Sequence, residues 1–164
     1  MPSPPKLSIP DSAETVAFRC IDTILRGSPD IVRVFRTVVS WRGDDIDGED
    51  PTASMCPYLM IVPGGRQSGW VSEGQHEEPM QVGILIAVEG SDADQLMNLW
   101  GLIRSTLFPQ DLTKMAAVQT ATTTAGITCG TLTAPAFSVN AKEADDATLL
   151  AAMGTLELYL MISP

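Results

Sequence analysis

Histidine and closely spaced cysteine are almost missing from this sequence of 164 residues. The only histidine is His76, and the three cysteines, Cys20, Cys56 and Cys129, lie far apart without a CxxC pair. Structural zinc sites need several cysteine or histidine ligands at short spacing, so the pattern argues against a metal site. An odd number of dispersed cysteines predicts buried, reduced thiols in a cytoplasmic compartment.

Long apolar runs and an excess of basic charge are also lacking. No segment approaches the roughly 20 apolar residues that span a bilayer, and the first residues, MPSPPKLSIP, lack the apolar core of a signal peptide. The chain has 10 basic and 20 acidic residues and a net charge of −10. Such a surface repels a phosphate backbone, so sequence-specific nucleic-acid binding is not expected.

The charge is unevenly distributed along the chain. Residues 1–42 hold six basic and four acidic residues, a net charge of +2, whereas the remainder holds four basic and sixteen acidic residues, a net charge of −12. Three arginines close the basic part: Arg33, Arg36 and Arg42. They predict either an ordinary solvated face or a contact with an acidic surface on another copy or another protein.

An acidic cluster follows these arginines and superficially suggests a calcium loop. Its members are Asp44, Asp45, Asp47, Glu49 and Asp50. An EF-hand loop that began at Asp45 would need glycine at position 50 and glutamate at position 56, but these are Asp50 and Cys56. The pattern therefore predicts an acidic surface loop without a metal.

Two segments have the spacing of amphipathic helices. Asp11 and Glu14 have capping-box spacing, and the apolar residues that follow predict a helix over residues 12–26 with Arg19, Asp22 and Arg26 facing outward. A second helix is predicted after Ser91 and before Pro109. Its apolar stripe consists of Leu96, Leu99, Trp100, Ile103 and Leu107.

Several segments read as strands. They are residues 31–42, 57–62, 80–89, 118–139 (as one or two strands) and 149–163. Residues 80–89 are almost continuously apolar, which predicts burial on both faces. Residues 140–148 are polar and predict a loop. The whole predicts an α+β fold: a mainly antiparallel β-sheet with two α-helices packed on one face, in a single domain over residues 12–164 after a proline-rich arm over residues 1–11.

The stretch PGGRQSGW, residues 63–70, looks at first like a phosphate-binding loop. It lacks the lysine and the following helix of a P-loop, and its three glycines do not have dinucleotide-loop spacing. It lies between two strand-like segments, which favours the tip of a β-hairpin. Arg66 and Trp70 on such a tip would be anchors for a protein contact.

No catalytic constellation emerges from the sequence. His76 beside Glu77 and Glu78 is the one titratable cluster near the hairpin, and nothing supplies a nucleophile or an orienting partner. We therefore expect a protein that is not an enzyme and that has no catalytic, cofactor-binding or metal-binding residues.

The order of elements resembles the tail terminator, or tail completion, proteins of long-tailed bacteriophages. The resemblance rests on the hairpin PYLMIVPGGRQSGWVSEGQHEEPMQVGILIAVEG, the helix SDADQLMNLWGLIRSTLF and the final strand TLELYLMIS. It implies a hexameric ring in the tail or neck of a virion, assembled in the host cytoplasm. Such a ring caps the tail tube, ends its polymerisation and joins a neck protein of the head, while DNA passes through without sequence-specific binding.

Under this resemblance, the acidic residues 44–50 would line the channel or a ring edge, and the three arginines of the basic part would pair with acids of the adjacent subunit. Arg66 and Trp70 would dock on the tube or the neck. Two alternatives stay open: another head–tail connector such as a head-closure protein, or a small ligand-binding or enzymatic α+β domain.

Overall fold

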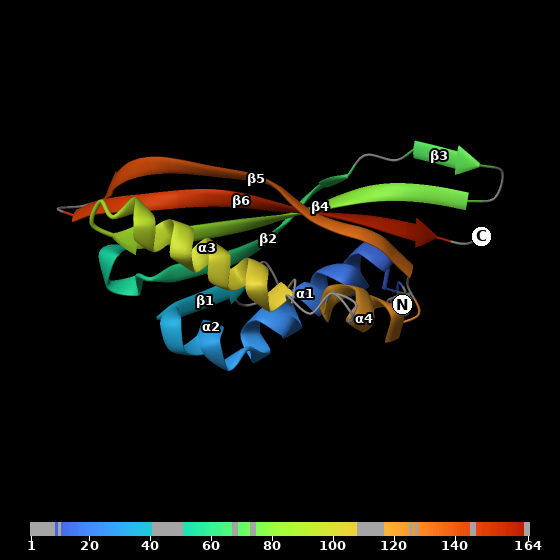
Figure 1. Ribbon diagram of the computed structural model, residues 1–164, viewed down its shortest axis with the longest axis horizontal. Coiled ribbons are helices and arrows are strands. Elements are labelled where there is room, and N and C mark those ends of the chain that lie inside the picture. The colour runs from blue at the N-terminus through green and yellow to red at the C-terminus, as the bar shows by residue number, and fades with distance from the viewer. Residues whose placement is uncertain are drawn as a thin grey trace, which may run out of the picture.

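The computed structural model describes residue 9, residue 126 and the ranges 11–40, 51–66, 69–72, 75–107, 117–124, 128–144 and 147–162. A twisted six-stranded sheet forms one layer of the fold (Figure 1). Its main path runs β1 (Thr37–Ser40), β2 (Tyr58–Arg66), β4 (Gln75–Glu89), β6 (Ala147–Ile162) and β5 (Thr128–Ala144), and β3 (Gly69–Ser72) pairs with β4. β1 and β2 are parallel and the other pairs are antiparallel, so the α+β prediction is confirmed and the sheet is mixed.

The second layer is helical and covers one face of the sheet. It consists of α1 (Ala13–Gly27), α2 (Pro29–Val34), α3 (Ala93–Leu107) and α4 (Ala117–Thr124), and a 3₁₀ turn, η2 (Ala53–Met55), precedes β2. The whole predicted stripe of α3 is buried, as are the inward residues of α1. They pack on alternate residues of the central strands: Leu59, Ile61, Val82, Ile84, Ile86, Val88, Leu156 and Leu158.

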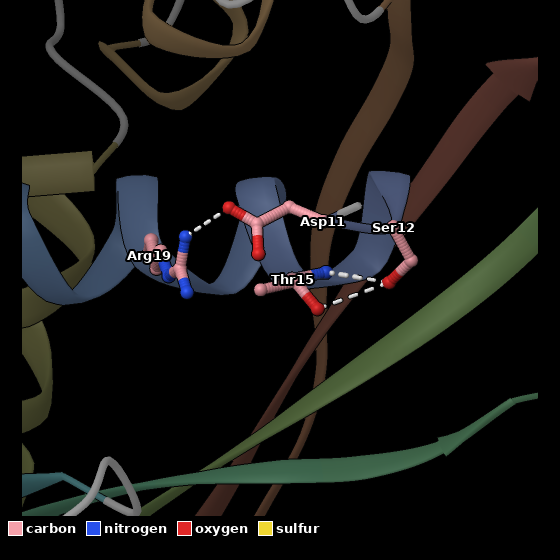
Figure 2. A network of polar contacts seen from close by, with 4 residues as sticks. All are labelled: Asp11, Ser12, Thr15 and Arg19. Atoms are coloured by element: carbon pink, nitrogen blue, oxygen red, sulfur yellow. Dashed lines mark hydrogen bonds and ion pairs between the residues drawn. The ribbon is translucent and has the colours of Figure 1, made fainter. Parts of the chain in front are cut away.

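The first helix begins one residue later than its capping-box spacing suggested. Figure 2 shows Ser12, not Asp11, at the cap: the backbone N–H of Thr15 donates to Ser12 Oγ at 3.2 Å. Asp11 instead forms an exposed ion pair with Arg19. In the second predicted helix the cap also shifts by one residue, because Asp92 rather than Ser91 accepts from the N–H groups of Asp94 and Gln95.

Substitutions at Ser12 and at Asp11 should therefore show which of the two residues caps α1. We expect Ser12→Ala to lower the free energy of unfolding by about 1 kcal/mol, because it removes the acceptor for a free N–H of the first turn. Asp11→Ala removes only an exposed ion pair and should cost less. Thermal unfolding of both variants checks this order, and a larger loss in Asp11→Ala would contradict it.

Two segments that the sequence predicts as strands are helical in the structure. Residues 31–34 continue α2, because Pro29 starts a helical turn and Ile31 and Phe35 are then both buried; the strand is confined to Thr37–Ser40. Residues 117–124 form α4, although they are rich in threonine. There the hydroxyls of Thr122, Thr123 and Thr124 donate to carbonyls of the preceding turn, which satisfies them inside a helix.

Residues 140–144 do not belong to a loop. They extend β5, whose last pair with β6 is Ala144 opposite Ala147, so strand pairing takes up most of the predicted polar loop. The strand over residues 80–89 is likewise not buried uniformly. It begins at Gln75, and Gly83 and Leu85, which alternate with its buried residues, are only half-buried.

The stretch PGGRQSGW does form part of a hairpin, but it is not the tip. Residues 63–66 stay in β2, where the register with β4 shifts between Pro63 and Arg66, as expected where glycines admit a bulge. The chain reverses between Ser72 and Gln75, at the end of β3. Trp70 lies in β3 opposite His76, and Arg66 lies in β2 opposite Met80.

Helix α3 lies close against the sheet at Gly154 of β6. A Cβ atom at that position would lie 2.4 Å and 2.5 Å from the Cη2 and Cζ3 atoms of Trp100. Trp100 is itself buried, so its ring lies against a strand that has room for it only because residue 154 has no side chain.

Candidate interaction surfaces

Most of the predicted contact residues lie outside the described residues or are described by their backbone alone. Arg42 and the acidic cluster Asp44, Asp45, Asp47, Glu49 and Asp50 lie outside the described residues. The structure gives Arg66 and Trp70 a place in the sheet through their backbone only. Arg33 and Arg36 are described and exposed: Arg33 lies on α2, and Arg36 lies between α2 and β1.

An open groove between α2 and α3 forms the first candidate surface. It has a volume of about 460 Å³ and is lined by Val34, Leu99 and Leu102, with Asp92, Asp94, Gln95 and Asn98 around it. We call this surface the helix groove. Val34 is 42% exposed and Val32, on the same short helix, is 57% exposed. The groove therefore has an apolar floor and two carboxylates at its mouth, where the first turn of α3 begins.

The second candidate surface is the face of the sheet opposite the helices, which we call the open face. The strand register places Val39, Met60, Leu85 and Met153 side by side on four neighbouring strands, β1, β2, β4 and β6. Three of these side chains are half-buried and Met153 is 41% exposed. We call this row the methionine row. None of the α-helices in the described part of the chain packs on it, but Val39, Met60 and Leu85 pack on the same buried cluster as η2.

Below the methionine row, the open face is closed at one end by η2. Ala53 and Met55 of η2 pack there on a small buried cluster of Cys56, Tyr58, Ala87 and Leu149. Arg36 lies at this edge, since its Nη1 donates to the carbonyl of Ser54 at 3.0 Å. Glu89 stands opposite Leu149, and the register places Lys142 on the other side of Leu149. Arg36 and Glu89 thus border this end of the open face.

The two described thiols were both predicted to be buried; Cys56 is buried, whereas Cys20 is only half-buried. Burial raises the pKa of the Cys20 thiol. Burial also raises the pKa of Cys56, with a further increase from Glu89 and an opposing effect of Arg36. Both are free cysteines and stay protonated at neutral pH, so neither is an activated nucleophile. Cys20 borders a shallow groove of about 260 Å³ between α1 and α4, which is mainly apolar.

One predicted outward residue is buried. Asp22 is only 3% exposed and accepts a hydrogen bond from Arg26 Nε at 2.8 Å. Arg26 Nη2 also donates to Ser40 Oγ at 2.9 Å, so the pair connects α1 to β1. The helical spacing alone could not show this, because β1 comes from a different part of the sequence and closes over that side of α1.

The described residues hold no metal-binding cluster of three or more histidine, cysteine or acidic side chains. Within the same part of the chain, no helix has both the length and the apolar character needed to cross a membrane. The sequence reasoning did not single out Val34, Met60 and Met153, which lie on the two candidate surfaces. The sequence did carry a signal for Met60 and Met153. Their strands are apolar at both sets of alternating positions, and the two predicted helices can cover only one face of the sheet.

Comparison with known proteins gives a likeness of fold. No family model and no curated protein of known sequence matches the chain. A solved structure that does match is a chain of the "Virion of native gene transfer agent (GTA) particle", with a TM-score of 0.53 and 7% sequence identity. The match covers 88% of this chain and 94% of that chain. At this identity the match shows that the two chains share a fold over almost their whole lengths.

Proposed function

We propose that this protein is a structural component of a phage-like virion. The observation that carries the proposal is the shared fold with a chain of a gene transfer agent virion, which extends over 88% of this chain and 94% of the other. The surfaces agree with it, because the described residues offer two partly apolar surfaces for protein contacts.

Within this class, we propose the role of a tail terminator. The protein would form a hexameric ring on the end of the tail tube, stop its growth and present a surface to a neck protein of the head. The order of elements in the sequence supports this role, as does the acidic composition. A net charge of −10 per subunit suits a channel through which DNA must slide without being held.

The decisive experiment is reconstitution with the tail tube. The protein should cap tubes assembled from the tube protein of the same virus, visible by electron microscopy as a ring at one end, and it should limit their length. Light scattering of the released ring should give about six times the subunit mass of 17.5 kDa. A ring that binds the neck protein and never the tube would assign the protein to head closure instead. A protein that binds neither would contradict the virion role.

A further inference from the structure

The groove between α1 and α4, which we call the α1 groove, meets the start of the chain through Arg19. Its lining consists of Val16, Arg19, Cys20, Thr23, Ile24 and Ala121 and is mainly apolar. Arg19 also pairs with Asp11, the last residue of the proline-rich arm. Figure 2 shows the Asp11 side chain pointing along α1, away from Ser12 and toward Arg19. The ion pair therefore holds the end of the arm at the wall of the α1 groove.

We infer that the arm of this chain docks in its own α1 groove, where the side chain of Leu7 covers Cys20 and Ile24. The structure describes two residues of the arm, Ile9 and Asp11. Ile9 is 89% exposed, so the next large apolar residue toward the N-terminus, Leu7, is the one that fills the groove. The inference concerns a single subunit, and it stands whether or not the protein forms a ring.

The arm is long enough to cover the groove. Val16 and Ile24 are separated by about 12 Å along the axis of α1, at the usual helical rise. A proline-rich extended segment rises about 3.1 Å per residue, so about four residues cover this length. Residues 1–10 would reach about 30 Å from Asp11 at the same rise. The arm therefore has length to spare once it leaves Arg19.

The composition of the arm suits an apolar groove on a helix. Its prolines, Pro2, Pro4, Pro5 and Pro10, restrict the chain before it docks, so less conformational entropy is lost on docking. Proline has no N–H and offers only its carbonyl, and Arg19 and Thr23 in the lining supply donors for such acceptors. An extended proline-rich segment makes one turn in three residues, so Leu7 and Ile9 point to different sides. Ile9 can then stay exposed while Leu7 is covered.

A small ligand or a separate molecule suits the α1 groove less well than the arm does. The groove has a volume of about 260 Å³, which is below the roughly 300–1,000 Å³ of pockets that take small ligands. A tethered segment has an effective concentration of about millimolar, and a free partner competes only at a comparable concentration. The arm of the same chain is therefore the favoured occupant.

Alkylation of Cys20 in the full chain tests whether the arm covers the groove. We expect iodoacetamide to modify Cys20 severalfold faster in Leu7→Asp than in the wild type, because a carboxylate does not enter an apolar groove. Ser8→Asp is the matched control, since it adds the same charge one residue along the arm and should leave the rate unchanged. Peptide mass spectrometry resolves the three cysteines. Cys56, which is buried outside the groove, is the internal reference and should keep one rate in all three proteins.

Disulfide trapping tests whether Leu7 itself reaches Cys20. In a glutathione redox buffer, the introduced thiol of Leu7→Cys should form an intramolecular disulfide with Cys20. The decoy is the triple variant Leu7→Cys/Cys20→Ser/Thr123→Cys. Thr123 is exposed on α4 and does not line the α1 groove, so random motion of the arm reaches a thiol there more easily than the half-buried Cys20. We expect severalfold less intramolecular disulfide in the decoy at the same glutathione ratio.

Three results would overturn the inference. Equal alkylation of Cys20 in the wild type and in Leu7→Asp would mean that Leu7 does not cover the thiol. Equal disulfide formation in the decoy would mean that the arm is tethered near the groove without docking in it. Disulfide-linked dimers of Leu7→Cys that persist on dilution would mean that the groove receives the arm of a second copy.

Discussion

Gly154→Ala is expected to destabilise the protein by about 2–3 kcal/mol, because the new methyl group would overlap the Trp100 ring. The clash involves two ring atoms within 2.5 Å of the added Cβ. A buried indole is rigid and surrounded by the core, so α3 must shift away from β6 to admit it. In a domain of this length the loss corresponds to a decrease in melting temperature of about 5–10 °C, measured by calorimetry or circular dichroism.

Gly83→Ala is the control for this variant. Gly83 lies in β4, in the same sheet, but a Cβ atom there would come no closer than 3.6 Å to any neighbour. Alanine at this position should be neutral within about 0.5 kcal/mol or slightly stabilising, because it restricts the unfolded chain. A similar melting temperature for both variants would contradict the close packing of Trp100. In the clash mechanism, Trp100→Phe should cost less in the Gly154→Ala background than in the wild type.

Arg26→Met has the second large expected effect, a loss of about 2–3 kcal/mol. The substitution keeps the aliphatic stem but removes the guanidinium that binds the buried carboxylate of Asp22 and the hydroxyl of Ser40. A carboxylate that is 3% exposed cannot regain full hydration when this cation is lost. The expected loss is smaller than that of a fully buried pair, because the side chain of Arg26 is itself 34% exposed.

The exposed pair on the same helix is the control. Arg19→Met removes the partner of Asp11, where both side chains are nearly half exposed, and should cost less than about 1 kcal/mol. Asp22→Asn should be milder than Arg26→Met, because the partly exposed guanidinium can reach water. Chemical denaturation of the three variants checks this order. Equal losses for Arg19→Met and Arg26→Met would show that burial of Asp22 is energetically unimportant.

The sequence predicted α3 almost completely, because a helix encodes its buried side at fixed spacing. All five residues of its apolar stripe are buried. The long final strand and its alternation were also predicted, as Leu156 and Leu158 are buried and Thr155 and Glu157 are not. Periodicity succeeds for such elements because their burial is repeated many times along one segment.

The same reasoning did not predict the short elements correctly. Residues 31–34 and 117–124 have β-branched side chains, yet both are helical. Here the position of Pro29 and the threonine hydrogen bonds to preceding carbonyls outweigh a weak intrinsic preference. The turn of the long hairpin was misplaced for a related reason, since glycines that admit a bulge inside β2 look like glycines of a turn.

The candidate surfaces likewise combine features that the sequence predicts with features that depend on the tertiary structure. The acidic net charge, the apolar content of each strand and the α+β class could be read from the sequence alone, because they follow from composition and local patterns. The sequence placed the expected contacts on arginines and on the PGGRQSGW stretch. Only the tertiary structure decided that Val34 borders a groove and that Met60, Leu85 and Met153 form one row. These residues are far apart in the chain, and their surfaces arise from strand register and from the side on which α3 packs against Gly154.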